Sequence, residues 1–462
     1  MSKIVQIEIK NLFGYLDYKI PLNTTDNITI IHGPNGSGKT WILQLIKAVF
    51  SLDYSGIRKA PVGEIAFRFQ DGGHFAVRRH VEEHPGLYPP LYRPEWIRPS
   101  FAKLIFSYSS KRTKKPKEFT FELPRSIDDR GRHFPLSMIE REIPHLERIG
   151  PQEWMDLSRN QVLSAQEVEV IYGRRLPWTS TRETTPQWLI DLTKRVNINY
   201  IQSQRLLQVP TPGTSRESAS RKDVIQMVEL YSGQLADKIS KTLAESVKIA
   251  QSRDKTFPTR LLRGEVSKVP SESELRKELA NLEYTRKQLY SAGLLDEEES
   301  VPLPKKAMSE MEKKVLSLYL HDVKEKLHVF DDIQTRIATL MFLINSKIEA
   351  QGKSLVIDRD KGFLFRSKFG TEKILRPTDL SSGEQHQVVL FFELLFKASN
   401  KAFILIDEPE ISLNVGWQRR FLDDLLKVIQ LCDYSILMAT HSPQIIHNRW
   451  DLAVPLSGGV KE

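Results

Sequence analysis

The sequence contains almost no cysteine and no long apolar run. Cys432 is the single cysteine among 462 residues, which excludes an internal disulfide framework and fits a reducing compartment. No segment approaches the ~18 apolar residues that a membrane-spanning helix requires, and the first residues lack the apolar stretch of a signal peptide. We therefore expect a cytoplasmic protein with no membrane partner, in which Cys432 is a small buried residue.

Acidic residues are outnumbered by basic ones. The chain has 67 Lys and Arg against 58 Asp and Glu, a formal net charge of +9 at pH 7. A surplus of this sign favours acidic partners such as nucleotides, nucleic acid or an acidic protein. The basic segment 111–117 is either a contact for such a partner or a solvated hairpin tip. The loop at residues 84–99 is rich in proline and aromatic residues, and such loops more often pack onto a core than bind bases.

The hydrophobic pattern changes along the chain. Residues 1–80 alternate with the period of strands, interrupted by a helical pattern at residues 40–50. Residues 222–351 are charged and helical and form an antiparallel helical arm. Prolines such as Pro258 are expected to cut its helices, and the last helix would cover about residues 306–350. Beyond the arm, a hairpin is followed by alternating helices and strands, which indicates an α/β fold.

A glycine-rich segment separates a predicted strand from the helix at residues 40–50. It matches the pattern G-x-x-x-x-G-K-[ST], and its residues are Gly33, Pro34, Asn35, Gly36, Ser37, Gly38, Lys39 and Thr40. Glycines let backbone N–H groups turn inward around phosphates, and the dipole of the following helix adds to this attraction. Lys39 can reach the β- and γ-phosphates, and Thr40 can ligate Mg²⁺. An ordinary Gly-rich turn is disfavoured, because both flanking elements are of the right kind.

An apolar strand delivers two carboxylates at its C-terminal end. In the segment FILIDE, Asp407 follows four apolar residues and Glu408 comes next. The chemistry needs one carboxylate to hold Mg²⁺, assigned to Asp407, and one to polarise an attacking water, assigned to Glu408. A strand-end helix cap is the competing interpretation, and it would be preferred without the phosphate-loop motif.

Ser381 and Gly383, in the segment LSSGEQ, stand at the beginning of a predicted helix. A helix N-terminus with these residues can bind an anion. Alternatively, Ser381 is an ordinary helix cap with Glu384 as its capping partner. The position of this segment before the carboxylate strand favours the anion site.

The segment ATHS places His441 at the end of another short apolar strand. Its imidazole could contact the γ-phosphate or hold the attacking water. A histidine in such a position is usually structural, but the order of the four motifs favours a functional one.

In this order, the segments GPNGSGKT, LSSGEQ, ILIDEPEISLN and ATHS resemble the heads of ABC-type ATPases, and more narrowly the SMC/RecF/OLD-like branch. The segment IEIKNLFGYLDYKIPL and the long helical insertion also resemble that branch. The resemblance implies an α/β fold, an ABC-type ATPase head with a mixed sheet and an inserted helical, coiled-coil-like arm. Residues 1–210 and 353–462 would form the two parts of the head, and residues 211–352 the arm.

The resemblance also implies that ATP and Mg²⁺ are bound between two copies of the chain. The phosphate loop and Asp407 of one copy would bind ATP, while Ser381 and Gly383 of the other copy would close on the γ-phosphate. The segment Ser412–Asn414 resembles the D-loop, which crosses the subunit interface. Ser382 replaces a glycine of the commoner signature, which implies slow turnover.

One further Mg²⁺ ligand is implied by the segment INYIQSQRL. Either Gln202 or Gln204 would join Thr40 and Asp407 around the ion, and we favour Gln204 because an arginine follows it. The implied catalytic residues are Glu408, His441 and Gln204.

Three classes of ATPase share such a head. A transporter subunit is disfavoured, because the chain has no membrane span and its helical insertion is long. A DNA-repair or DNA-end-binding ATPase of the SMC/RecF type would explain the charge and the arm. However, the arm is short, and a single cysteine cannot form a Cys-x-x-Cys zinc hook.

The third class is the sensor ATPases of bacterial phage defence. The size and layout of the chain resemble the ATPase subunits of PARIS-like systems, with the Septu-like ATPases and their HNH partner as an alternative. Because the chain ends shortly after His441, we expect a separately encoded effector, a TOPRIM-type nuclease. The resemblance implies a homo-oligomeric scaffold that releases this effector on sensing a phage trigger. An acidic phage protein and DNA both fit the charge.

Overall fold

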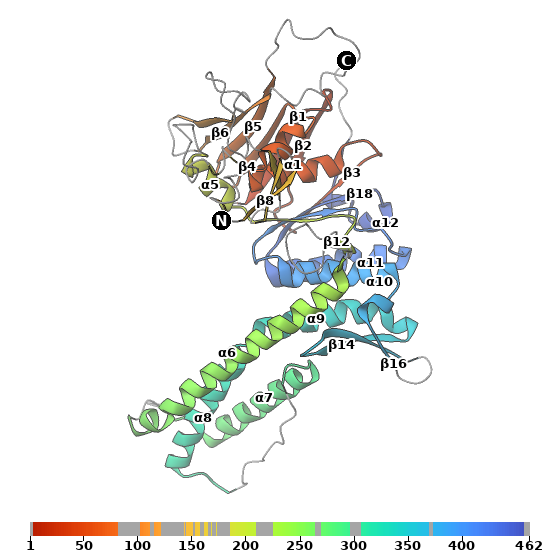
Figure 1. Cartoon of the computed structure of the whole chain (residues 1–462). Coiled ribbons are helices and arrows are strands. Elements are labelled where there is room, and N and C mark those ends of the chain that lie inside the picture. The colour runs from red at the N-terminus through yellow and green to blue at the C-terminus, as the bar shows by residue number, and fades with distance from the viewer. Residues whose placement is uncertain are drawn as a thin grey trace, which may run out of the picture. The chain divides into compact units, whose positions relative to one another are not determined.

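The computed structural model in Figure 1 describes most of the chain. The described residues are 3–81, 102–110, 115–121, 143, 145–150, 153–157, 161–164, 168, 172, 185–208, 225–263, 269–295, 306–368 and 373–456. The loop at residues 84–99 and residues 111–114 of the basic segment lie outside them. The chain divides into two compact units: the first consists of residues 1–203, 210–221 and 398–462, and the second of residues 204–209 and 222–397.

The first unit contains an antiparallel sheet and a parallel sheet. The antiparallel sheet has the order β2-β1-β4-β5-β6-β7. Its strands are β1 (Ile4–Leu12), β2 (Leu16–Pro21), β4 (Glu64–Phe69), β5 (His74–Val81), β6 (Ala102–Ser109) and β7 (Lys117–Phe121). Residues alternate along β1, so that Ile7 and Ile9 are buried while Lys10 is exposed. One face of this sheet therefore supplies a large apolar core.

The parallel sheet has the order β11-β17-β18-β3-β19. Its strands are β3 (Ile28–His32), β11 (Ile198–Ile201), β17 (Phe403–Asp407), β18 (Ser435–Thr440) and β19 (Ala453–Pro455). All residues of β17 are buried, as expected for a strand covered on both faces. Because the strands are parallel, their carboxyl ends meet at one edge, where ligands bind in open α/β sheets.

Helices of the first unit pack around these sheets. They are α1 (Lys39–Ser51), α2 (Tyr54–Lys59), α5 (Gln187–Lys194), α11 (Val415–Cys432) and α12 (Pro443–Ile446). Helix α1 buries an apolar face that includes Ile42, Leu45 and Ile46, and each such side chain stabilises the fold by about 1.5–3 kcal/mol. Cys432 is buried at the end of α11. A small sheet, β8 (Leu146–Gly150), β9 (Glu153–Asp156) and β10 (Gln161–Ser164), packs around the buried Trp154.

The second unit is mainly helical. Its long helices are α6 (Met227–Arg263), α7 (Glu272–Ser291), α8 (Glu310–His328) and α9 (Asp331–Ile348). Helix α6 packs against α8, and α8 packs against α7 (Figure 1). Two sequence predictions are wrong here. The expected helix over residues 306–350 is two helices that break between His328 and Asp331, and Pro258 lies inside α6 without ending it.

A buried ion pair fixes the end of α6 against α8. The guanidinium of Arg260 donates to both carboxylate oxygens of Asp322 at 2.7 and 2.6 Å, and both side chains are buried. Arg260 also donates to the carbonyl oxygen of Arg253, one turn before Pro258. These contacts support the backbone on either side of the proline. Because an unpaired buried charge costs about 3–5 kcal/mol, the pair also opposes sliding of α6 along α8.

The second unit ends with a short sheet and one further helix. The sheet contains β14 (Lys353–Asp358), β15 (Gly362–Ser367) and β16 (Lys373–Leu375), and a separate pair is formed by β12 (Leu207–Gln208) and β13 (Ile225–Gln226). Helix α10 (Ser382–Phe392) continues into a π-helical turn at Glu393–Lys397. The predicted α/β fold with an inserted helical arm is thus confirmed. The division into residues 1–210, 211–352 and 353–462 stays a prediction.

The described helices include no candidate for a membrane-spanning helix. Across the described parts of residues 3–456, no helix combines the length and the apolar character needed to cross a bilayer.

Candidate functional site

The phosphate-loop motif forms the connection between β3 and α1, as predicted. Gly36 and Gly38 both have a φ of 84°, in the left-handed region that other residues rarely adopt. An added Cβ at Gly38 would also lie 2.6 Å from Cδ2 of Leu12. Backbone conformation and close packing therefore require glycine at this position.

Lys39 lies inside the loop, with 5% of its surface exposed. Its Nζ donates to the carbonyl oxygens of Gly33 at 2.8 Å and Pro34 at 2.9 Å. Burial lowers the pKa of Lys39, and the carboxylates of Glu408, Glu410 and Asp407 oppose this shift. The ammonium group is held at the loop by neutral oxygens, which an anion could replace.

The beginning of α1 is a candidate seat for an anion. Gly38 is its N-cap, no side chain caps it, and its first turn contains no acidic residue. The first N–H groups of a helix have no partner within the helix, and the helix dipole makes this end positive. The loop and the helix together form a suitable seat for phosphate groups.

Asp407 comes to this loop from the end of β17. The hydroxyl of Thr40 donates to Oδ1 of Asp407 at 3.1 Å, and the hydroxyl of Tyr200 donates to Oδ2 at 3.3 Å. Asp407 is 2% exposed. Burial raises its pKa, and the neighbouring charges of Glu408 and Glu410 raise it further, against the two hydrogen bonds. A cation at this position would relieve an unfavourable negative charge.

Glu408 and His441 face one another across the carboxyl ends of β17 and β18. Oε1 of Glu408 lies 3.5 Å from Nε2 of His441, and about a third of each side chain is exposed. The backbone of Glu408 has a φ of 44°, and its N–H donates to the carbonyl of Ala439 at 2.9 Å. Such a conformation in a residue with a side chain is strained and occurs often at functional sites.

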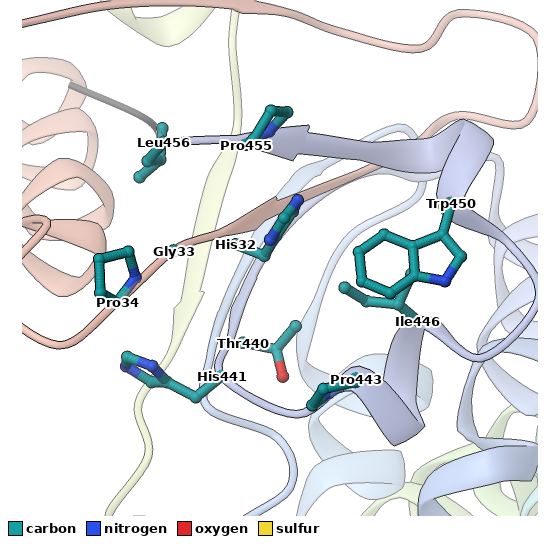
Figure 2. Close-up of a pocket in the computed structure, with 10 residues that line it drawn as sticks. All are labelled: His32, Gly33, Pro34, Thr440, His441, Pro443, Ile446, Trp450, Pro455 and Leu456. Carbon is teal, nitrogen blue, oxygen red and sulfur yellow. The ribbon is translucent and has the colours of Figure 1, made fainter. Parts of the chain in front are cut away.

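A cavity of about 370 Å³ lies beside the phosphate loop. Its lining residues are His32, Gly33, Pro34, Thr440, His441, Pro443, Ile446, Trp450, Pro455 and Leu456. Figure 2 shows the His441 and Trp450 side chains at opposite sides of this space. The cavity therefore opens the His441 side of the loop to a bound molecule.

Ser381 and Gly383 belong to the second unit, at the beginning of α10. Ser381 is the N-cap and forms a reciprocal capping box with Glu384, so this competing interpretation of the sequence is realised. Glu384 is buried, and Nζ of Lys353 donates to both of its oxygens at 3.0 and 2.9 Å. The anion-binding role of Ser381 and Gly383 stays a prediction.

The two candidate glutamines fall in different units, Gln202 in the first and Gln204 in the second. Both are exposed. The next residue, Arg205, is buried and donates from Nε to Nδ1 of His386 in α10 at 3.2 Å. Burial and the charge of Arg205 lower the pKa of His386 to about 4, so this histidine is neutral at pH 7. The role of Gln204 stays a prediction.

A family model described as an AAA domain matches residues 6–328. The chain belongs to the AAA-domain family. A second AAA-domain model, named for the AbiEii toxin of a type IV TA system, matches residues 250–447 of this AAA protein. Membership of this ATPase family implies nucleotide binding.

Curated relatives of the AAA protein cover only part of it. Two strains of Mycobacterium tuberculosis, CDC 1551 and H37Rv, contain an uncharacterized ABC transporter ATP-binding protein that is 33% identical over 110 residues. This match covers 24% of the present chain, which spans 42% of the length of these relatives.

Solved structures of SMC heads are also similar to the AAA protein. The Smc head of Pyrococcus furiosus, bound to the C-terminal domain of ScpA, is 15% identical with a TM-score of 0.31, over 97% of this chain and 92% of that one. The SMC head of Thermotoga maritima is 11% identical with a TM-score of 0.31, over 98% and 92%. Scores this low do not establish a shared fold, so the family assignment depends on the AAA model.

The residues of the AAA protein fit a nucleotide with its metal ion. The loop offers Lys39 and the uncapped helix start, and Thr40 and Asp407 would supply two oxygen ligands. Within the described residues, no cluster of three or more His, Cys, Asp or Glu side chains is arranged around a metal.

Two residues near the site were not predicted from the sequence. Tyr200 reaches Asp407 because β11 pairs with β17 in parallel, a pairing that no local pattern reveals. Glu410 lies two residues after Glu408 within the segment ILIDEPEISLN. A third acidic residue so close to Asp407 and Glu408 was a usable signal.

Proposed function

We propose that this AAA protein binds ATP with Mg²⁺ and hydrolyses ATP slowly. The observation that carries this proposal is the hydrogen bond between Thr40 and Asp407. It joins the phosphate loop to the carboxylate strand across 367 positions of the sequence. Taken alone, each of these two motifs could be an ordinary turn or strand end. The hydrogen bond brings them together at one place.

The residues in the proposed site divide the work of binding and hydrolysis among them. The loop from Gly33 to Thr40 binds the phosphates, and Lys39 donates to the terminal ones. Thr40 and Asp407 hold Mg²⁺, which would neutralise phosphate charge when bound, and Gln204 is proposed as a further ligand and catalytic group. Glu408 accepts a proton from the attacking water, and His441 orients the water or the terminal phosphate.

We further propose that the active site is completed by a second copy. Ser381 and Gly383 of one copy would close on ATP held by the phosphate loop of the other. The AAA protein then acts as a head-to-head dimer, within a larger homo-oligomer. Ser382 replaces a glycine in this signature segment, and its side chain would impede closure and make turnover slow.

Mixing two inactive variants tests this shared site. Lys39→Ala removes the phosphate lysine, and Ser381→Arg blocks the signature segment, so each protein alone should lack ATPase activity. In an equal mixture, half of the dimers are mixed and each of these has one intact site, so about a quarter of the wild-type rate should return. The measurement is phosphate release over a range of protein concentrations.

A mixture with no activity would contradict the shared site, provided that both variants keep the wild-type unfolding temperature. A wild-type rate per molecule that does not change on dilution would contradict it as well.

A more specific proposal is that the AAA protein is the sensor subunit of an antiphage system. It would hold a separate effector nuclease of the TOPRIM type and release it on sensing a phage trigger, in the manner of AriA, the ATPase of PARIS. The match to the AbiEii-named model supports a defence context. The net charge of +9 supports an acidic trigger or DNA.

Co-purification tests the sensor proposal. Tagged Glu408→Gln protein is expressed with its native gene neighbours and purified in ATP, because a variant that cannot hydrolyse ATP should retain its partners. We expect a stoichiometric nuclease-like protein and little nucleic acid, identified by mass spectrometry. An HNH nuclease would favour the Septu-like alternative. Nuclease-sensitive DNA without a protein partner would contradict the sensor role and favour DNA repair or DNA-end binding.

A further inference from the structure

Glu410 makes a contact that none of the proposed roles uses. It follows the carboxylate strand β17 and comes two residues after Glu408. Its Oε1 accepts a hydrogen bond from the hydroxyl of Thr440 at 2.8 Å and a second one from the backbone N–H of His441 at 2.7 Å. One carboxylate oxygen thus holds the last residue of β18 and the histidine that follows it.

The surroundings make this contact rigid. Thr440 is fully buried, and its hydroxyl also accepts from the N–H of Ser442 at 3.0 Å. The backbone N–H of Leu413 donates to the carbonyl of Glu410 at 2.9 Å, which fixes the other end of the acidic residue. A hydrogen bond to a charged acceptor is worth about twice a neutral one, so the carboxylate is a strong anchor for this turn.

The contact also constrains where the imidazole of His441 lies. The ring reaches to within 3.5 Å of Glu408 and borders the cavity in Figure 2. The turn that carries Glu408 has a φ of 44° at that residue, and His441 lies in the irregular segment that follows β18. Glu410 connects these two segments directly.

We infer that Glu410 is a positioning residue, which holds His441 at the distance from Glu408 that hydrolysis requires. This inference rests on the proposed ATPase function. Glu410 need not touch ATP or water, since it acts through the backbone of His441. A displacement of about 1 Å at a reacting group can cost about 10²-fold in rate, so the loss of this anchor should be visible in the chemical step.

The experiment compares Glu410→Ala and Glu410→Gln by single-turnover ATP hydrolysis. We expect Glu410→Ala to lower the rate constant at saturating ATP by about 10- to 100-fold and to leave the affinity for ATP unchanged. Glu410→Gln keeps an acceptor oxygen and should recover most of the rate. Gln418→Ala is the matched control. It removes bonds to Ser442 and to the Leu413 carbonyl in the same turn without touching His441, and it should retain most of the rate.

A double-mutant cycle separates positioning from general stability. If Glu410 acts through His441, then Glu410→Ala should have no further effect in a His441→Ala background, because residues that act as a unit are not additive. The inference would be overturned if the rate losses of Glu410→Ala and His441→Ala multiplied in the double variant. An equal loss of rate in Gln418→Ala would overturn it as well.

A measurement without ATP keeps this test independent of the proposed function. Hydrogen–deuterium exchange of peptides that cover residues 436–446 should be faster in Glu410→Ala than in wild type. Unchanged exchange would overturn the inference even if the wild-type protein does not hydrolyse ATP. Absence of hydrolysis in the wild type, with faster exchange in the variant, would instead contradict the proposed function alone.

Discussion

Replacing Lys39 with alanine is expected to weaken ATP binding by about 10²- to 10⁴-fold. The ammonium group is nearly buried among the loop carbonyls, so it can turn to phosphate oxygens without leaving the loop. Two charge-assisted hydrogen bonds contribute about 3–6 kcal/mol, and each 1.4 kcal/mol corresponds to about tenfold in affinity. Isothermal titration of the purified protein with ATP and Mg²⁺ measures this loss.

Two controls make the Lys39 result specific. Lys59→Ala removes an exposed lysine from α2 in the same unit and should bind ATP like the wild type. Thermal unfolding without nucleotide should differ little between the variants, since alanine favours the helix that Lys39 begins. Wild-type affinity in a folded Lys39→Ala protein would mean that the loop does not bind the phosphates.

Glu408→Gln is expected to abolish most hydrolysis while leaving ATP binding intact. Glutamine has nearly the shape of glutamate but cannot accept a proton from water, and general-base catalysis is worth about 10²- to 10⁴-fold. Single-turnover hydrolysis with a radiolabelled γ-phosphate should show this decrease, and titration with ATP should give the wild-type affinity. The variant should therefore accumulate the ATP-bound state.

An exposed glutamate supplies the matched control for this substitution. Glu118 lies on β7, an edge strand of the antiparallel sheet, and Glu118→Gln makes the same chemical change far along the chain from the motifs. It should hydrolyse ATP at the wild-type rate. If Glu408→Gln does so too, Glu408 is not the residue that activates water.

The strands and helices around the site could be predicted from the sequence, because each motif lies within a few residues of a strand or helix end. The strand before Gly33, the helix after it and the buried strand leading to Asp407 all appear where the apolar pattern places them. The resemblance to ABC-type heads implied that Thr40 and Asp407 lie together, and the hydrogen bond between them agrees with this. The sequence also predicted the capping box of Ser381 with Glu384, as the alternative to an anion site.

The sequence did not predict features that depend on tertiary packing. Pro258 is tolerated inside α6, where the buried pair of Arg260 and Asp322 holds the helix end. The break at His328 carries no proline or glycine, so no local signal marked it. The distance along the chain also hid the contact of Arg205 with His386, which ties the second candidate glutamine to the unit of the signature segment.

The strand order of the parallel sheet has a consequence for synthesis on the ribosome. Strand β3 ends at His32, but its neighbours β18 and β19 begin at Ser435 and Ala453. At about 5–20 residues per second, roughly 20–80 seconds pass before either neighbour is made. During this time an apolar strand that leads into the phosphate loop has two unpaired edges, which are prone to aggregate. The parallel sheet around β3 can therefore form, and be stabilised by nucleotide, only after translation has passed β18.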